Sequence, residues 1–206
     1  MAIEGLLKQG LLQLELSASE QQQSKLLLLL DELLKWNKAY NLTAIKSAKD
    51  ALVLHLLDSL SVAPYIRQNH LVDVGTGAGF PGLPLAIMLP KVKFTLLDSN
   101  NKKIRFIRQQ IHLLELSNVD VIHSRVEKVK AESFDGIISR AFASIPDMVN
   151  QTQHLLSENG CWLAMKGHYV ASEIKEITGL VEEVAHHQLQ VPGLSAERCL
   201  IELKLR

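Results

Sequence analysis

The arrangement of apolar and polar residues changes near residue 70. Before it, apolar residues recur every three or four positions, as in Leu26, Leu29, Leu30, Leu33 and Trp36, which is the spacing of one helix face. After it, short apolar runs alternate with amphipathic stretches. The pattern predicts helices in the first third of the chain and alternating strands and helices in the rest.

Two capped helices are expected before residue 70. Ser17 and Glu20 have the spacing of a capping box, which predicts a helix from there to about Lys38. Ser47 is placed to cap a second helix, which is expected to end near Val62. These helices predict an N-terminal extension over residues 1–66 that packs on a larger domain over 67–206.

A polar trio lies within the second of these helices. His55, Asp58 and Ser59 occupy positions i, i+3 and i+4, so they share one face of the helix. Two interpretations are open at this stage. The trio lines an active-site cleft, or it ties the N-terminal helices to the sheet.

The larger domain is expected to contain a doubly wound α/β sheet. Right-handed crossovers make successive strands parallel, but only Pro192, Gly193 and their neighbours separate the last two strands, which predicts an antiparallel hairpin. Strands are expected at 70–74, 92–98, 119–123, 135–140, 160–166, 185–191 and 198–205, and helices at 81–88, 101–114, 145–156 and 169–178.

A glycine-rich turn carries the strongest functional signal. It follows the first apolar strand and contains Gly75, Gly77 and Gly79. Glycine permits positive φ angles, and the lack of side chains lets a ligand lie against the backbone. A helix begins directly afterwards, so its N-terminus completes a cradle for a nucleotide-like ligand.

Acidic residues on both sides of this turn bear on which ligand it holds. Asp73 ends the preceding strand, where a carboxylate attracts an ammonium group and repels a pyrophosphate. Asp98 ends the next strand, about 20 residues beyond the turn, as ribose-binding acids do. The spacing of Gly77, Gly79 and Gly82 keeps a nicotinamide dinucleotide open. Asp73 favours S-adenosylmethionine as the cofactor instead.

Charge limits the classes of partner. The 206 residues include 22 basic and 22 acidic side chains, which is unlike a general nucleic-acid coat protein. Between Lys91 and Lys130, however, nine basic residues stand against four acidic ones. Within that region Lys102, Lys103 and Arg105 open a helix, where cations oppose the helix dipole. They are interpreted as RNA phosphate contacts or as an ordinary solvated helix face.

Neither a metal site nor a membrane segment is indicated. Cys161 and Cys199 are the two cysteines, and they form no C-x-x-C or His/Cys cluster. The first residues lack the layout of a signal peptide, and the apolar run Leu26–Leu30 is too short to cross a bilayer. We expect a cytoplasmic protein that acts as a monomer.

Residues just after the strands are the candidates for chemistry, because ligands bind open α/β sheets at the carboxyl ends of the strands. Val126 and Glu127 follow the third strand, where the main chain can meet an adenine edge. Arg140 and Lys166 follow the fourth and fifth strands. They are expected to project toward the reaction site, or to pair with carboxylates such as Asp73 or Glu127.

Residues that are missing narrow the reaction further. Methylation of an exocyclic amine commonly uses an Asn/Asp-Pro-Pro-Tyr/Phe loop after the fourth strand, but residues 139–142 read Ser-Arg-Ala-Phe. Methylation of a pyrimidine carbon 5 needs a cysteine in the cleft, and neither cysteine is expected there. Ring nitrogens and oxygen remain. Guanine N7 has a free lone pair and needs no general base, so positioning can supply the catalysis.

Several segments occur together in one known family. They are Trp36–Thr43, His55–Ser59, Leu96–Ser99, Ser124–Glu127 and Ser139–Phe142, arranged around the glycine turn in the family's order. Over nearly its whole length the chain resembles the ribosomal RNA small-subunit methyltransferase G family, formerly called glucose-inhibited division protein B.

The resemblance implies a Rossmann-like class I methyltransferase fold, with a seven-stranded, mostly parallel sheet. It also implies methyl transfer from S-adenosylmethionine to N7 of a guanine in the 530 loop of 16S rRNA, either free or in the small ribosomal subunit. An NAD-dependent oxidoreductase and an RNA-binding module without catalysis are the alternatives. Matching positions predict cofactor contacts at Gly75, Phe80, Val126, Glu127 and Arg140. Strand-end geometry alone adds Asp98 as the ribose ligand and Lys166 beside the guanine.

Overall fold

A computed structural model describes residues 2–130, 133–140, 142 and 144–206 of the chain. In this part of the chain a sheet of seven strands has the order β3-β2-β1-β4-β5-β7-β6. The strands are β1 His70–Val74, β2 Lys93–Asp98, β3 Val119–His123, β4 Phe134–Ser139, β5 Leu156–Lys166, β6 Val181–Leu189 and β7 Arg198–Leu205.

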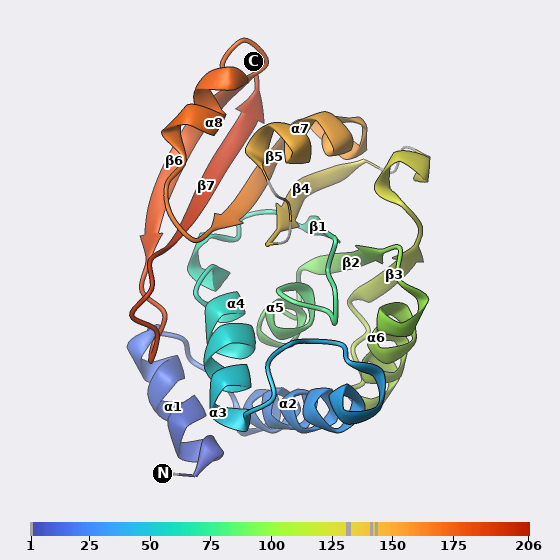
Figure 1. Ribbon diagram of the computed structural model, residues 1–206, viewed down its shortest axis with the longest axis vertical. Coiled ribbons are helices and arrows are strands. Elements are labelled where there is room, and N and C mark those ends of the chain that lie inside the picture. The colour runs from blue at the N-terminus through green and yellow to red at the C-terminus, as the bar shows by residue number, and fades with distance from the viewer. Residues whose placement is uncertain (1, 131–132, 141, 143) are drawn as a thin grey trace.

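Helices cover both faces of this sheet (Figure 1). Helices α7 and α8 lie on one side, α5 and α6 lie on the other, α2 runs beyond α5 and α6, and α1 lies beside α3. The helices are α1 Ile3–Gln13, α2 Glu20–Tyr40, α3 Ala48–Ala51, a π-helix Leu52–Leu57, α4 Asp58–Leu60, α5 Gly82–Met88, α6 Asn101–Leu113, α7 Ile145–Thr152 and α8 Ala171–Glu176.

Strand pairing confirms the expected sheet. Strands β1 to β5 pair in parallel, and β7 lies antiparallel between β5 and β6. Two strands are longer than the sequence indicates, because β5 begins at Leu156 and β6 at Val181. The added residues are partly exposed, so they lack the apolar run that would have revealed them.

The first long helix starts two residues later than expected. Its capping box is formed by Ser19 and Gln22, not by Ser17 and Glu20. The Ser19 hydroxyl accepts the Gln22 N–H at 3.1 Å, and the Gln22 side chain accepts the Ser19 N–H at 2.9 Å. Gln22 also donates to the carbonyl of Ile87 near the end of α5. This tertiary contact favours the later of two similar capping registers.

Helix α1 was not expected from the sequence. Its N-cap residue, Ala2, makes no side-chain cap hydrogen bond, so the usual start signal is missing. Leu7 and Leu11 nevertheless bury one face of α1 against the helices that follow.

The second expected helix is not a single α-helix. Ser47 caps it as predicted, accepting the Asp50 N–H at 3.0 Å, but residues 52–57 form a π-helix between α3 and α4. Wider π-helical turns often occur at functional sites, and this one carries His55.

Two apolar clusters fill the two sides of the sheet. One joins the N-terminal helices to α5 and α6 and includes Leu30, Leu56 and Phe106. The other lies beneath α7 and α8 and includes Trp162 and Met148. Because the first cluster runs from α1 to the sheet, the N-terminal helices are packed on the α/β core, and their division from it at residue 66 stays a prediction.

A buried hydrogen bond under α7 gives a test of this packing. The indole N–H of Trp162 donates to the Thr152 hydroxyl at 2.8 Å, and both side chains are fully buried. Replacing Thr152→Val leaves the indole N–H without an acceptor, which should lower the free energy of unfolding by about 1–3 kcal/mol. Urea denaturation measures this loss. Thr152→Ser keeps the hydroxyl and should recover most of it; equal loss in both variants would contradict the assignment.

Candidate active site

The glycine turn between β1 and α5 has the conformation that its sequence predicts. Gly75, Gly77 and Gly79 have φ angles of 69°, 64° and 90°, which L residues with side chains rarely adopt. A Cβ atom on Gly79 would lie 2.4 Å from the side chain of Leu83. The turn therefore requires glycine for its backbone and for its packing on α5.

Asp73 holds this turn together through two hydrogen bonds. Its Oδ2 atom accepts the Thr76 hydroxyl at 2.6 Å and the Gly82 N–H at 2.8 Å. Burial raises the pKa of Asp73 to about 6, although these two hydrogen bonds and the positive charge of Arg140 act in the opposite direction. Its other oxygen, Oδ1, is buried and has no partner among the described residues. A buried acceptor of this kind calls for a donor.

Asp98 connects the same turn to the start of α6. Its Oδ2 atom accepts the Gly77 N–H at 2.9 Å, and its Oδ1 atom accepts the Asn100 N–H at 2.8 Å. Each carboxylate oxygen can accept a further hydrogen bond. The carboxylate is therefore fixed in position and still able to bind ligand hydroxyls.

A cleft of about 350 Å³ opens beside this carboxylate. We call it the turn cleft. Its lining joins the glycine turn to the ends of β2 and β3 and includes four of the predicted cofactor residues. These four are Gly75, Asp98, Val126 and Glu127.

A second cavity, of about 440 Å³, lies at the ends of β4 and β5. We call it the arginine cavity; its lining includes His55, Asp58, Arg140, Lys166 and Arg198. The structure brings Arg140 and Lys166 together, as strand-end geometry predicts. It places them in this cavity and not in the lining of the turn cleft, and the cofactor contact that the resemblance implies for Arg140 stays a prediction.

The carboxylate partners of these two cations differ from those that were expected. Arg140 pairs with Asp58 at 2.9 Å, and Lys166 pairs with Glu173 at 3.2 Å. Asp73 forms no ion pair with a described residue, and its Oδ2 is bound to the glycine turn. Glu127 points elsewhere and lies 4.0 Å from Arg125.

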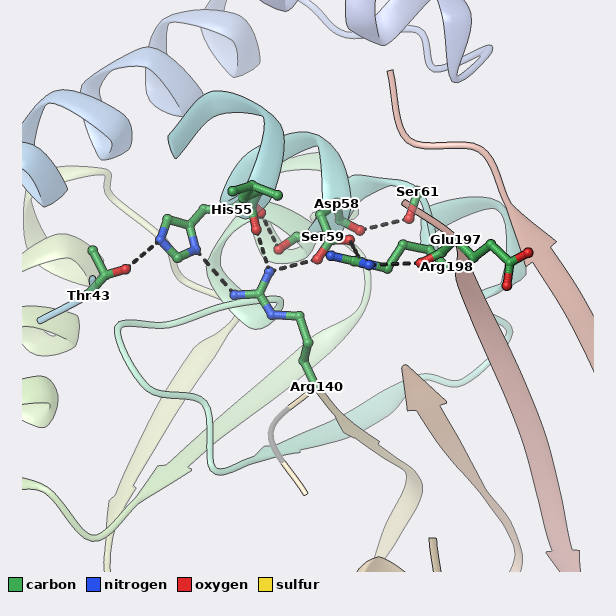
Figure 2. A network of polar contacts seen from close by, with 9 residues as sticks. Thr43, His55, Asp58, Ser59, Ser61, Arg140, Glu197 and Arg198 are labelled. Carbon is green, nitrogen blue, oxygen red and sulfur yellow. Dashed lines mark hydrogen bonds and ion pairs between the residues drawn. The ribbon is translucent and has the colours of Figure 1, made fainter. Parts of the chain in front are cut away.

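Figure 2 shows how Arg140 is held from the N-terminal side of the chain. Its Nη1 donates to the Leu54 carbonyl and to Asp58 Oδ2, both at 2.9 Å, and its Nη2 donates to His55 Nδ1 at 3.3 Å. His55 and Asp58 thus line the cavity and also tie the helices to the sheet. Ser59 does neither, because it is fully buried and donates to the main chain of His55.

Arg198 is a site residue that the sequence did not reveal. Its Nε donates to Asp58 Oδ1 at 2.9 Å, so Asp58 lies between two arginines. The sequence-based candidates all follow parallel strands. An antiparallel strand begins at the edge where parallel strands end, and Arg198 is the first residue of β7. The predicted hairpin was therefore the signal that could have identified it.

The remaining predicted site residues lie around the two cavities. Phe80 is buried and stacks on His55 with 4.8 Å between ring centroids. Lys102 and Arg105 are exposed at the start of α6, and the Nζ of Lys103 lies 3.8 Å from where a Cβ on Gly77 would be. Within the described ranges, the three cations at this helix start form no ion pair.

One expectation about the cysteines is wrong. Cys199 is not remote from the cavities but lines the arginine cavity, because β7 begins at the carboxyl edge of the parallel strands. Burial raises the pKa of its thiol, which disfavours the thiolate that a nucleophile would need. Cys161 is buried and accepts a hydrogen bond from Gln68.

The loop after β4 has no exocyclic-amine motif in its sequence, and the structure describes it at Ser139, Arg140 and Phe142. Ser139 donates to the Val74 carbonyl at 2.8 Å, and Phe142 lines the turn cleft. Ala141 lies outside the described residues.

Over the described ranges, no helix is long and apolar enough to cross a membrane, and no group of three or more His, Cys, Asp or Glu side chains is placed to hold a metal ion.

Solved structures share the fold at low sequence identity. The tRNA methyltransferase TrmK from B. subtilis has a TM-score of 0.60 at 15% identity, covering 72% of this chain and 65% of that one. A SAM-dependent methyltransferase from Aquifex aeolicus has a TM-score of 0.57 at 14% identity, covering 76% and 93%. These likenesses confirm the class I methyltransferase fold.

Sequence comparison is more specific. A ribosomal RNA small subunit methyltransferase G from Psychromonas ingrahamii is 48% identical over 193 residues, 93% of each chain. One from Saccharophagus degradans is 50% identical over 193 residues, 93% of this chain and 86% of that one. The family model described as rRNA small subunit methyltransferase G matches residues 22–201. With two cavities at the carboxyl ends of the strands of a methyltransferase fold and these matches along its length, the chain belongs to the rRNA small subunit methyltransferase G family.

Proposed function

We propose that this chain transfers the methyl group of S-adenosylmethionine to N7 of a guanine in the 530 loop of 16S rRNA. The observation that carries the proposal is the pairing of a nucleoside-sized cleft on the glycine turn with a cation-lined cavity at the next strand ends. Family membership supports rRNA of the small subunit as the substrate.

The residues of the turn cleft fit the methyl donor. Asp98 would accept the ribose hydroxyls, and the main chain at Val126 and Glu127 would meet the adenine. Asp73 is fully buried and is not among the residues that line the cleft, so its Oδ1, which has no described partner, would act on an ammonium group through a bridging water. A dinucleotide would bring its pyrophosphate toward this acid, and the family match gives no support to a nicotinamide enzyme. When bound, the donor supplies an electrophilic methyl group on a sulfonium.

The arginine cavity supplies the means to orient a guanine. Arg140 and Lys166 carry N–H donors that can bind guanine O6, while N7 must stay free to react. The N7 lone pair attacks without losing a proton, so the chain needs no general base. Its contribution is to hold the purine in line with the methyl group and to exclude water.

The basic start of α6 offers a route for the RNA backbone to the site. Lys103 lies next to the glycine turn, and Lys102 and Arg105 are exposed near the start of the same helix. Phosphate contacts position a nucleic acid without reading its sequence. We propose that these three side chains hold RNA phosphates while the arginine cavity receives the base.

The product of the reaction tests the proposed function directly. Small ribosomal subunits from cells lacking this protein should acquire 7-methylguanosine in the 530 loop when they are incubated with the protein and labelled donor. Nucleoside analysis of the digested 16S rRNA measures it. A different methylated nucleoside would overturn the N7 assignment, and rRNA binding without any transfer would favour the RNA-binding alternative.

Asp98 gives a test of the cofactor site. Asp98→Ala removes the acceptor for ribose and the anchor of the Gly77 N–H, which should weaken donor binding roughly ten- to a hundredfold, the effect of losing one or two charged hydrogen bonds. Isothermal calorimetry measures the change. Asp120→Ala on the neighbouring strand removes an exposed carboxylate that pairs with Lys93 and should leave the affinity unaltered. Equal affinity in all three proteins would exclude Asp98 as a ligand.

Lys166 gives a test of the guanine site. Lys166→Met should reduce methyl transfer to small subunits roughly tenfold through lost positioning, with donor affinity unchanged because Lys166 does not line the turn cleft. Initial rates with labelled donor and calorimetry provide the two measurements. The matched control, Lys175→Met on the exposed face of α8, should keep the full rate. A loss of donor affinity in Lys166→Met would place this lysine in the cofactor site.

A further inference from the structure

The long side chain of Arg140 is held by three hydrogen-bond partners. It has five N–H donors. The two on Nη1 donate to the Leu54 carbonyl and to Asp58, and one on Nη2 donates to His55. All three partners come from the π-helix and the first residue of α4. Among the described residues, no other acceptor is bound to its guanidinium, so within this part of the chain Nε and one Nη2 hydrogen have no partner.

The contact with Arg140 fixes the protonation of His55. A guanidinium can only donate, so His55 Nδ1 must carry a lone pair and accept. The ring proton is therefore on Nε2, which lies 2.9 Å from the Thr43 hydroxyl oxygen. Burial and the positive charge of Arg140 lower the pKa of His55 to about 4, so the imidazole is neutral at pH 7.

Thr43 is in turn held by the segment that links α2 to α3. Its main-chain N–H donates to Asn37 Oδ1 at 2.9 Å, and its hydroxyl accepts the Ile45 N–H at 3.2 Å. Asn37 also donates to the Ile45 carbonyl at 3.1 Å. The proposed reaction does not use the Trp36–Thr43 segment. This segment is connected to Arg140 through the contact of Thr43 with the His55 imidazole (Figure 2).

We propose that His55 is a positioning residue, held as the Nε2–H tautomer by its contacts with Arg140 and Thr43, that orients the guanidinium of Arg140 for methyl transfer. The inference rests on the proposed function and adds a structural requirement to it. The guanidinium of Arg140 is oriented only when the link between α2 and α3 is folded.

The surroundings of the imidazole support a role in orientation. Phe80 stacks on one face of the ring, which fixes its plane. The charged groups nearby are Arg140, Asp58 on the same helical segment, and Arg198 and Lys166 across the cavity. A protonated His55 would add a second positive charge and present an N–H to another N–H donor, so only the neutral ring can hold Arg140 in this position.

A double-mutant cycle in kcat/KM tests whether His55 acts through Arg140. His55→Leu should reduce kcat/KM roughly ten- to a hundredfold, since small misplacements of a positioning group have effects of that size. The same change made together with Arg140→Lys should reduce it by less than about twofold beyond Arg140→Lys alone, because the oriented group is already lost. Losses that multiply would show independent roles and overturn the proposal.

Milder variants guard against a failure to fold. Thr43→Val removes the acceptor for Nε2–H and should reduce kcat/KM about tenfold, whereas Thr43→Ser keeps the hydroxyl and should retain the rate. Ser59→Ala is the matched control, since Ser59 bonds only the main chain of His55, and should also retain the rate. Equal rates in the two Thr43 variants would contradict the proposal.

Histidine ¹⁵N NMR provides a readout that does not depend on activity. At pH 7 the His55 signals should show the Nε2–H tautomer in the wild type and lose that preference in Arg140→Leu, which removes the donor to Nδ1. An Nδ1–H tautomer or a charged ring in the wild type would overturn the proposal even if methyl transfer is normal. Conversely, a wild type that makes no 7-methylguanosine would refute the proposed function while leaving the tautomer test valid.

Discussion

The carboxylate of Asp58 is the constraint on which the arrangement of the site depends. It is 2% exposed, and a buried carboxylate is tolerated only when its charge is paired and hydrogen-bonded. The pairing is supplied by Arg140, 82 positions along the chain, and by Arg198, 140 positions along. One buried charge therefore fixes the N-terminal helices, the end of β4 and the start of β7 at one edge of the sheet.

Phe80 connects the glycine turn to residues that line the arginine cavity, although the two cavities share no described lining residue. Phe80 ends the turn and stacks on His55, and Arg140 lies 6.0 Å from the centre of the Phe80 ring. A change in the turn would reach the arginine cavity through this ring. Asp73 and Asp98 hold the other side of the turn, which leaves little freedom for a ligand to alter one cavity without the other.

Sequence reasoning was most accurate where one local rule decides the structure. The bounds of β1 and β3 match, as do the parallel order and the C-terminal hairpin, because β1 is a buried apolar run and β3 a short, partly exposed one, each bounded by turns. It failed where a tertiary contact chose between local options. Gln22 selected the later capping register, α1 forms without a side-chain cap, and the π-helix leaves no simple pattern in sequence. Arg198 required knowing that an antiparallel strand starts at the ligand edge.

Charge balance in the arginine cavity is consistent with the proposed reaction. Methylation of N7 moves the positive charge from the sulfonium to the purine, so three unpaired cations around the base would oppose it. Instead, Asp58 is bound to both arginines and Glu173 to Lys166. The described charges sum to one positive unit, from three cations and two carboxylates. This net positive charge can attract guanine O6. The cavity can still hold the cationic product, because the paired carboxylates offset most of the repulsion.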